Sequence, residues 1–505
     1  MFDVFKVLKF VKNVFSAEQW IAFIGIITAF FTTRLINLTT FPIFTDEGIY
    51  INWAKIAWKD ASWRFISLTD GRQPLQTWGT IPFLKFFPDN PLLAGRLFAV
   101  FSGLATLLGI VFLTYYLFGK RASLIAGILY VLTPFFIFYD RLALVDSMVN
   151  AGFVWILFGS IVLVKTMRLD VALVLGLISG TALLAKSSSR LFIGLAALAP
   201  ILGFEKNKKK LLSLISNFYF LFLISSFIAL VMYNIQRLSP YLNFVAEKNK
   251  TFVLTFSEFL QSPFQLLFHN TQIIPYYIAS ESGYVLILFG LIGLYFLFKK
   301  DVRLAGYLTL WIVLPFFAIS SFAKVVYPRY LIFFVTTLLI LAAYFLTRIK
   351  KKNILVLCST LYVLSVAYLN YTMLFDQSKI PLPAIDRWQY IEGVSSGWGL
   401  KELMTRAKDE SQGKRVILIA EGNFGVVGDM LNASLAPNDN VNVKGYWPLE
   451  KKHLVENQPL LKKDKVFIVF SHRKEFPTDW PMKKVEEYHK PGNDSAFYLF
   501  ELLEQ

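Results

Sequence analysis

The chain is 505 residues long; 55% of its residues are hydrophobic and only 17% are charged. Soluble globular proteins carry charge on about a quarter of their residues. The composition therefore excludes an ordinary soluble domain and favours a protein that lies in lipid. The net charge of +17 comes from short basic clusters between apolar runs, a membrane-protein pattern that excludes nucleic-acid binding as its explanation. The single cysteine, Cys358, excludes an intrachain disulfide bond and a cysteine metal cluster.

Apolar runs long enough to cross a membrane recur over the first 375 residues. A spanning helix needs roughly 20 apolar residues, and about eleven runs approach that length. Two of them, 170–186 and 190–204, are short for complete spans. The runs lie at residues 19–38, 91–118, 121–139, 143–164, 170–186, 190–204, 211–233, 283–298, 303–322, 330–347 and 353–375.

Lysine and arginine mark every second loop between these runs. Cytoplasmic loops carry this excess in multi-pass proteins, so we expect the N-terminus in the cytoplasm. An odd number of spans then places residues 376–505 on the extracytoplasmic side of a plasma (inner) membrane. The basic residues are Lys120, Arg121, Lys165, Arg168, Lys206, Lys208, Lys209, Lys210, Lys299, Lys300, Arg303, Arg348, Lys350, Lys351 and Lys352.

The composition changes after residue 375, where prolines and charged residues replace the apolar runs. Strand-like runs follow at 416–420, 441–446, 465–470 and 497–502, with a helical stretch at 400–408. We therefore predict a polytopic α-helical membrane domain over residues 1–375, with large outer loops at 39–90 and 234–282. A soluble α/β domain over residues 376–505 completes the chain.

Two adjacent acids, Asp46 and Glu47, follow the first apolar run. They begin a pattern with Ile49 and Trp53 on one face, which is typical of a helix lying along the membrane surface. Thr45 or Asp46 is expected to cap this helix. The helix dipole favours an ionised carboxylate there, and such a group could act as a general base. The alternative interpretation makes Asp46 only a cap and Glu47 a solvated acid.

The ordered motifs around this acid pair resemble those of a known family. They look like the motifs of the GT-C membrane glycosyltransferases of the protein O-mannosyltransferase and aminoarabinose-lipid A transferase (ArnT-like) kind. The resemblance covers about residues 30–200, and a basic-aromatic entry to a late span is similar as well. The matching residues are Arg34, Leu35, Pro42, Asp46, Glu47, Tyr50, Arg72, Pro74, Leu75, Trp78, Arg96, Leu97, Arg141 and Asp146, with Tyr327, Pro328, Arg329 and Tyr330 at the late span.

The chain departs from the family pattern at two places. The family often has Lys where this chain has Arg72, and Thr-Lys-Gly-Pro where residues 185–190 read Ala-Lys-Ser-Ser-Ser-Arg. We therefore expect this chain to contact the head group of its sugar donor differently from members of that family.

The resemblance implies a reaction. Members of this family transfer one sugar, with inversion, from a polyprenyl- or dolichyl-phosphate carrier to a hydroxyl of a lipid, glycan or protein acceptor. Asp46 would be the general base, with Glu47 beside it and Tyr50 in support. The chemistry requires no cofactor, and a divalent cation is compatible with it. No metal site is expected, because the 4 histidines lack ligand spacing.

Cations are needed because the leaving group is a lipid phosphate that develops negative charge. The candidates at the outer ends of the spans are Arg72, Lys186, Arg190 and Arg329. Each has an alternative as a side chain that snorkels to the interface. Arg141 and Asp146 would support the site, although together with Asp140 they are equally compatible with a structural ion pair that braces two spans.

Three other classes of protein compete with this interpretation. A transporter or flippase should show paired halves and ionisable residues in mid-span; the chain has no such halves. A membrane scaffold would leave the acid pair and the ordered basic residues unexplained. A ligase or polymerase that moves lipid-linked glycans would use much the same residues and stays open as an alternative.

Overall fold

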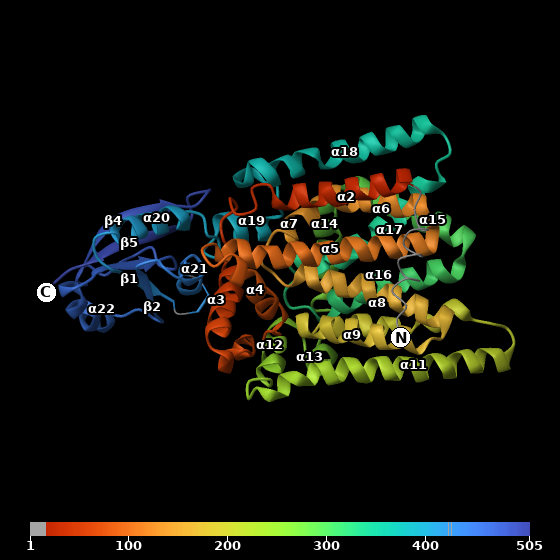
Figure 1. The fold of residues 1–505 in the computed structure, drawn as a ribbon, viewed down its shortest axis with the longest axis horizontal. Coiled ribbons are helices and arrows are strands. Elements are labelled where there is room, and N and C mark those ends of the chain that lie inside the picture. The colour runs from red at the N-terminus through yellow and green to blue at the C-terminus, as the bar shows by residue number, and fades with distance from the viewer. Residues whose placement is uncertain (1–16, 423, 426, 505) are drawn as a thin grey trace. The chain divides into compact units, whose positions relative to one another are not determined.

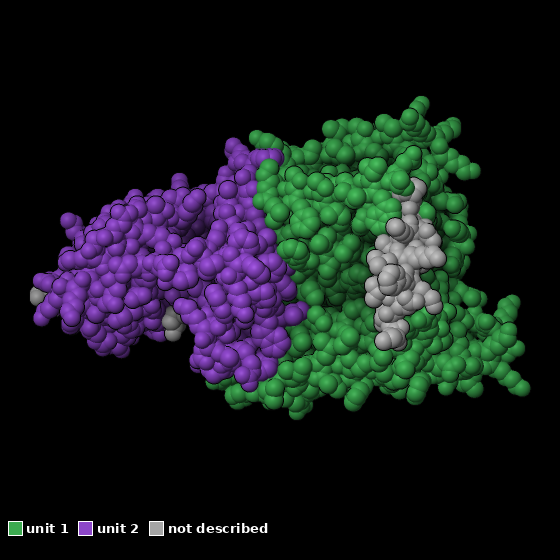
Figure 2. Space-filling model, viewed as in Figure 1, with its two compact units in different colours: residues 1–36, 100–140, 145–374 green, residues 37–99, 141–144, 375–505 purple. Residues whose placement is uncertain are grey.

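The computed structural model describes residues 17–422, 424–425 and 427–504. The chain divides into two compact units, drawn in green and purple in Figure 2. Unit 1 comprises the residues up to 36 together with 100–140 and 145–374. Unit 2 comprises 37–99, 141–144 and the residues from 375 onward.

Unit 1 is helical (Figure 1). The boundary between the units falls inside α5 (Pro91–Phe118). Among the described residues of unit 1, the other helices are α2 (Ala17–Leu35), α6 (Lys120–Leu132), α7 (Pro134–Tyr139), α8 (Asp146–Thr166), α9 (Leu169–Ala185), α10 (Ser189–Ala196), α11 (Lys208–Asn234), α12 (Phe244–Phe252), α13 (Phe256–Gln261), α14 (Leu267–Ser282), α15 (Tyr284–Lys300), α16 (Val302–Phe322), α17 (Ile332–Arg348) and α18 (Lys352–Phe375), with short 3-10 turns at Ala199–Gly203, Ile235–Leu238 and Pro328–Leu331.

Within the described residues, 6 helical segments are long and apolar enough to cross a membrane, and α14 with α15, bent by 110° at their junction, would make a seventh. The predicted run 121–139 is divided, because Pro134 disfavours a helical conformation for the preceding Thr133, which has ψ 120. The polytopic helical fold is confirmed, whereas the count of eleven spans stays a prediction. The 6 segments are Pro91–Phe118, Asp146–Thr166, Lys208–Leu238, Val302–Phe322, Pro328–Arg348 and Lys352–Phe375.

Small residues allow the helices of unit 1 to pack closely. A Cβ at Gly176 of α9 would lie 2.7 Å from the carbonyl oxygen of Ser225 in α11. A Cβ at Gly290 of α15 would lie 2.9 Å from the carbonyl oxygen of Leu338 in α17. Close backbone approach of this kind holds helices together in lipid, where apolar burial alone gives little advantage.

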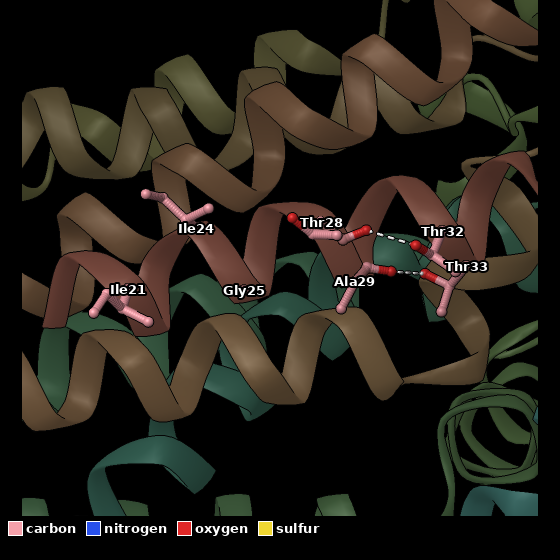
Figure 3. Close-up of a pocket in the computed structure, with 7 residues that line it drawn as sticks. All are labelled: Ile21, Ile24, Gly25, Thr28, Ala29, Thr32 and Thr33. Carbon is pink, nitrogen blue, oxygen red and sulfur yellow. Dashed lines mark hydrogen bonds between the residues drawn. The ribbon is translucent and has the colours of Figure 1, made fainter. Parts of the chain in front are cut away.

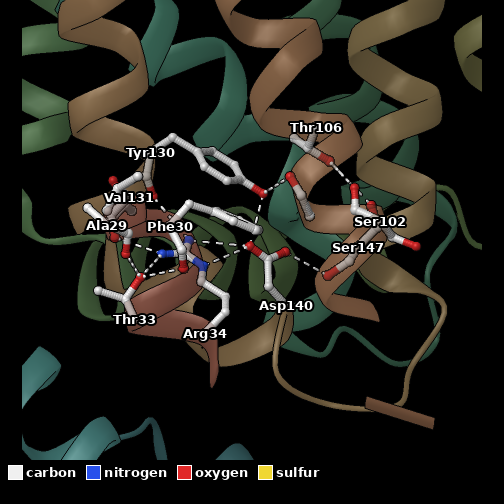
Figure 4. Close-up of polar contacts among 12 residues, drawn as sticks. Ala29, Phe30, Thr33, Arg34, Ser102, Thr106, Tyr130, Val131, Asp140 and Ser147 are labelled. Carbon is white, nitrogen blue, oxygen red and sulfur yellow. Dashed lines mark hydrogen bonds and ion pairs between the residues drawn. The ribbon is translucent and has the colours of Figure 1, made fainter. Parts of the chain in front are cut away.

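A buried polar network braces α2, α6 and the start of α8 (Figure 4). Nε and Nη2 of Arg34 each lie 3.3 Å from Oδ2 of Asp140, and the Tyr130 hydroxyl donates to the same oxygen at 3.0 Å. Ser147 donates to the other carboxylate oxygen at 2.8 Å. The predicted ion-pair brace therefore exists, but its cation is Arg34 and not Arg141. A buried charge pair is tolerated only with such additional hydrogen bonds.

Unit 2 combines the first outer loop with the C-terminal domain. The loop supplies α3 (Thr45–Lys59), α4 (Leu75–Phe86) and 3-10 turns at Ala61–Trp63 and Ile66–Asp70. The C-terminal domain supplies the remaining elements: a 3-10 turn (Gln377–Lys379), α19 (Ala384–Arg387), the π-helical turn η7 (Trp388–Glu392), α20 (Leu400–Glu410), β1 (Val416–Glu421), α21 (Gly428–Ala433), β2 (Val441–Tyr446), α22 (Lys451–Asn457), a 3-10 turn (Gln458–Lys462), β3 (Lys465–Phe470), β4 (Met482–His489) and β5 (Ala496–Leu502).

The five strands form one mixed sheet in the order β2-β1-β3-β5-β4. The first three strands are parallel, and Val416 pairs with both Val441 and Lys465. β5 runs antiparallel to β3 and to β4. The predicted α/β domain is thus confirmed with its four predicted strands. β4 was not predicted, because its alternating charged residues lie at the sheet edge.

One hydrophobic core of unit 2 extends beyond the C-terminal domain. The buried side chains of Ile43, Ile51 and Ala143 pack in the same cluster as Leu418 and Met430 of that domain. The outer loop 37–99 therefore forms one compact unit with residues that follow position 375. Burial of this apolar surface stabilises α3.

Candidate active site

The N-terminus of α3 positions the acid pair. The helix begins at Thr45, and its N-cap residue is Phe44, which makes no side-chain cap hydrogen bond. The prediction that Thr45 or Asp46 caps the helix is wrong. The Thr45 hydroxyl donates instead to the carbonyl oxygen of Ser395 at 2.8 Å, and Glu47 accepts the Phe44 N–H at 2.9 Å. Asp46 is therefore not the cap, which removes capping as the alternative role for this residue.

Asp46 forms an ion pair with Arg72. Nη2 of Arg72 lies 3.0 Å from Oδ1 of Asp46, and Nε of Arg72 lies 2.9 Å from Oδ2 of Asp70. The side chains of Asp46 and Arg72 are each 20% exposed. The structure thus brings together two residues that the sequence predicted for one site, and it adds Asp70, which the sequence did not indicate.

Aromatic rings complete the surroundings of Arg72. Its guanidinium lies over the rings of Tyr50 and Trp53, 5.3 and 6.0 Å from their centroids. Burial lowers the pKa of Arg72, but the neighbouring Asp46, Tyr50 and Asp70 outweigh this effect and raise it above its ordinary value. The group is a permanent cation that can orient a carboxylate and hold a phosphate oxygen. Tyr50, which the sequence predicts as a supporting residue, lies beside Arg72.

Glu47 lies in a different environment from its neighbour. It is fully buried, and Arg96 donates to its two carboxylate oxygens at 2.9 and 2.8 Å. The N–H of Ala143 donates to the same carboxylate at 2.7 Å. Because these bonds and that of Phe44 engage both oxygens, the geometry favours a structural role for Glu47. A catalytic role for this residue stays a prediction.

A residue of the C-terminal domain faces the same region. Asp429 accepts hydrogen bonds from Nδ2 of Asn52 at 2.6 Å and from the N–H of Gly425 at 2.7 Å. Burial raises the pKa of Asp429, and the lowering effect of these bonds and of the Arg72 charge does not fully offset it. No local motif in the sequence connects Asp429 with α3, since 377 positions separate it from Asn52.

A second cationic cluster lies in unit 1. Nζ of Lys186 is 3.0 Å from Oδ1 of Asp146 and 3.9 Å from the centroid of the Tyr330 ring. The guanidinium of Arg329, largely buried, lies over the rings of Tyr327 and Tyr330 at 5.1 and 5.5 Å. The structure therefore brings Lys186, Asp146 and Arg329 together around Tyr330. Two cations and a tyrosine hydroxyl are suitable groups for binding a phosphate.

The two other predicted arginines make contacts of a different kind. Arg190 of unit 1 donates to the hydroxyl of Tyr233 at 2.9 Å and lies over the same ring. Arg141 of unit 2 donates to the carbonyl oxygen of Asn37 at 2.9 Å. Arg190 keeps an exposed position, whereas Arg141 is buried. Neither contact shows a ligand role.

A hollow on α2 is a poor candidate for polar chemistry (Figure 3). It is lined by Ile21, Ile24, Gly25 and the residues that follow on one face of the helix. The hydroxyls of Thr32 and Thr33 donate to carbonyl oxygens one turn earlier, so they offer little to a ligand. The surface is suited to hydrocarbon.

The fold is that of the GT-C membrane glycosyltransferases, as the ordered motifs predicted. Crystal structures of ArnT from Cupriavidus metallidurans, in the apo state and bound to undecaprenyl phosphate, match with TM-scores of 0.62 and 0.61. Both are 13% identical, and the matches cover 96% of this chain and 98% of ArnT. The chain is a multi-pass membrane protein with this architecture.

An archaeal enzyme shares the fold over part of its length. The oligosaccharyltransferase AglB from Archaeoglobus fulgidus, in complex with an inhibitory peptide and a dolichol-phosphate, matches with a TM-score of 0.54 and 14% identity. This match covers 90% of the chain and 69% of AglB. No family model matches the sequence, and no curated protein matches it significantly.

Proposed function

We propose that this chain is a glycosyltransferase that moves a sugar from a polyprenyl- or dolichyl-phosphate carrier to an acceptor hydroxyl, with inversion. The observation that carries the proposal is the pairing of Asp46 with Arg72 at the start of α3. The carboxylate is partly exposed and is not the helix cap. The similar structures support the carrier, since they include ArnT bound to undecaprenyl phosphate and AglB with a dolichol-phosphate.

In the proposed reaction Asp46 accepts the proton of the acceptor hydroxyl while the hydroxyl oxygen attacks the anomeric carbon. The bond from that carbon to the lipid phosphate breaks, and its electron pair leaves with the phosphate. Arg72 orients Asp46 and offers a cation to the phosphate. The sequence-based prediction that Lys186 and Arg329 are further cations for the carrier stays a prediction; cationic charge next to a phosphate stabilises it as a leaving group.

The proposal is tested with the purified chain in lipid nanodiscs and a panel of radiolabelled polyprenyl-phosphate sugars. Transfer to added acceptors, or slow release of the free sugar to water, is the expected result for at least one donor. The release should disappear in Asp46→Asn and persist in Asp409→Asn, a matched change at an exposed position of α20. A chain that processes no donor of the panel would contradict the proposal.

The similarity to AglB supports a second candidate, the transfer of a whole lipid-linked oligosaccharide. The two candidates differ in the donor. Monosaccharides on a lipid monophosphate should be used under the first proposal, and oligosaccharides on a lipid pyrophosphate under the second. Competition between the two donor types in one assay decides between them.

We also propose that the C-terminal domain is extracytoplasmic, because the basic clusters lie in alternate loops. In a Cys358→Ser background, a cysteine at the exposed Lys414 should react with a membrane-impermeant maleimide in intact cells. A cysteine at the exposed Lys206 should react only after the membrane is opened. The reverse labelling would overturn the topology.

A further inference from the structure

A cavity of about 260 Å³ lies in the C-terminal domain, and the Asp46 cluster contributes none of its lining residues. Its walls come from the π-helical turn η7, from the segment after β3 and from the start of β5. β3 ends at Phe470, so Ser471 and His472 line the cavity directly beyond the carboxyl end of a parallel strand. Ligands of α/β sheets bind at this edge.

Two aromatic residues, Trp388 and Tyr498, line the cavity. The side chain of Trp388 is 47% exposed, and its indole lies against Gly393, where a Cβ would be only 2.6 Å from the ring. Glycine at this position therefore lets the indole rest on the backbone. Tyr498 packs against Phe476 in an edge-to-face arrangement, with ring centroids 5.0 Å apart. Rings fixed in this way offer apolar faces with polar edges.

Polar groups of mixed character complete the lining. Asp494 is an acceptor, Lys474 is a donor, and both are exposed. The hydroxyl of Ser471 is buried and has no hydrogen-bond partner among the described residues. Burial lowers the pKa of His472, and the nearby Glu421 charge only partly opposes this, so the imidazole is mainly neutral near pH 7 and can both donate and accept. The charges are balanced, which disfavours a strongly ionic ligand.

A buried lysine fixes the wall behind Gly393. Nζ of Lys490 donates to the carbonyl oxygens of Gly393 and Val394 at 3.0 and 3.1 Å. Val394 itself lines the cavity. The backbone of this wall is therefore held in place before any ligand arrives, and a preformed site loses less entropy on binding.

We propose that this cavity binds one sugar ring of a glycan, and that the glycan is the acceptor of the reaction. The second part rests on the proposed function. The cavity is smaller than the roughly 300–1,000 Å³ of sites for drug-sized molecules, so it suits a single ring. Apolar ring faces and balanced donors and acceptors match an uncharged polyol, whose hydroxyls need hydrogen bonds while its C–H faces need apolar contact.

The test uses the full chain in nanodiscs without donor, and saturation-transfer NMR with the methyl glycosides of glucose, galactose, mannose and N-acetylglucosamine. At least one glycoside should bind. Trp388→Ala should weaken binding about tenfold or more, and Asp494→Asn about threefold to tenfold. Trp388→Phe keeps a ring and should retain most binding. Trp63→Ala and Asp409→Asn, at exposed positions outside the cavity, should leave binding unchanged.

Separate results overturn the two proposals. Absence of saturation transfer for all four glycosides, or equal losses in Trp388→Ala and Trp63→Ala, would overturn the sugar site and leave the lipid-phosphate transferase intact. Asp46→Asn should bind the glycoside normally. Glycoside binding by a chain that uses no lipid-phosphate donor would support the cavity and contradict the proposed function. In an active chain, Trp388→Ala should raise the KM for the glycan acceptor without lowering kcat.

Discussion

Asp46 and Glu47 are neighbours in the chain, and each is paired with an arginine, yet the two pairs lie in opposite environments. The Asp46–Arg72 pair is partly exposed and is flanked by aromatic faces. The Glu47–Arg96 pair is completely buried and engages backbone groups from two other segments. Successive helical residues point about 100° apart. Less than a third of a helical turn therefore separates a partly exposed carboxylate from a fully buried one, and adjacency in the sequence says little about environment.

The largest expected effect is that of Asp46→Asn. The change preserves shape and removes the proton acceptor, and general-base catalysis is typically worth about 100- to 10,000-fold in rate. We expect a stable, correctly inserted protein that binds donor and transfers almost nothing, measured by turnover with a radiolabelled donor. Near-wild-type turnover would contradict the general-base role of Asp46 and leave the fold assignment unaffected.

Glu47→Gln should lower the stability of the folded protein. Removal of one partner from a buried ion pair typically costs about 3–5 kcal/mol, and the amide of Gln retains some of the hydrogen bonds. We expect a clearly lower Tm in detergent, with normal turnover per folded molecule. Glu402→Gln, at an exposed position of α20, is the matched control. A stable Glu47→Gln protein that is as inactive as Asp46→Asn would give Glu47 a catalytic role and contradict its structural assignment.

Arg72→Ala should lower the efficiency of donor use by about 10- to 100-fold, because a charge-assisted contact to phosphate is worth about 1.5–3 kcal/mol. Arg72→Lys should retain part of this, since the charge remains while the bidentate geometry is lost. Steady-state kinetics at varied donor concentration measure the efficiency of both Arg72 variants. Asp70→Asn removes the second partner of Arg72 and should have a smaller effect. Normal donor use by Arg72→Ala would contradict the assignment of this residue.

The smallest expected effect on activity concerns Lys490, which lies outside the acid pair and should act on stability alone. Burial lowers the pKa of its ammonium group from 10.5 to about 7. Between these values the unfolded chain binds more protons than the folded chain, so the free energy of unfolding should rise with pH across this window. The free-energy cost of burying the charged ammonium group is fully present below pH 7 and decreases toward pH 10.5.

Thermal melts of the wild type and Lys490→Met measure this contribution. The difference in Tm should move in favour of the wild type as the pH rises from 7 to 10. Lys483→Met, at an exposed position of β4, should show no such trend. A constant difference across the range would mean that Lys490 stays charged in the folded state.

The sequence predicts well what depends on local composition. Apolar runs predict the helical membrane domain, and alternating β-rich runs predict four of the five strands. The edge strand β4 is not predicted, because its charged residues make its sequence resemble that of a loop. Pro134 divides a continuous apolar run into two helices, a break that hydropathy alone does not predict.

Contacts across long sequence separations could not be predicted. The ordered motifs place Asp46 and Arg72 in one site, but no local pattern reveals that Asp429 bonds to Asn52 or that Lys186 lies against Tyr330. The cap prediction failed for a related reason. The Thr45 hydroxyl donates to the backbone carbonyl oxygen of Ser395, and the sequence around Thr45 cannot reveal such a distant partner.

The shared core of α3 and the C-terminal domain has a consequence for biosynthesis. Lys55 donates to the carbonyl oxygen of Leu435, which lies 380 positions later in the chain. At about 5–20 residues per second, the ribosome needs about 20–80 seconds between these two points. During that interval the early helices can insert, but the helix that carries Asp46 lacks the core formed with Leu418 and Met430. Activity should therefore begin only when synthesis ends, and a prematurely terminated chain should reach the bilayer without a working catalyst.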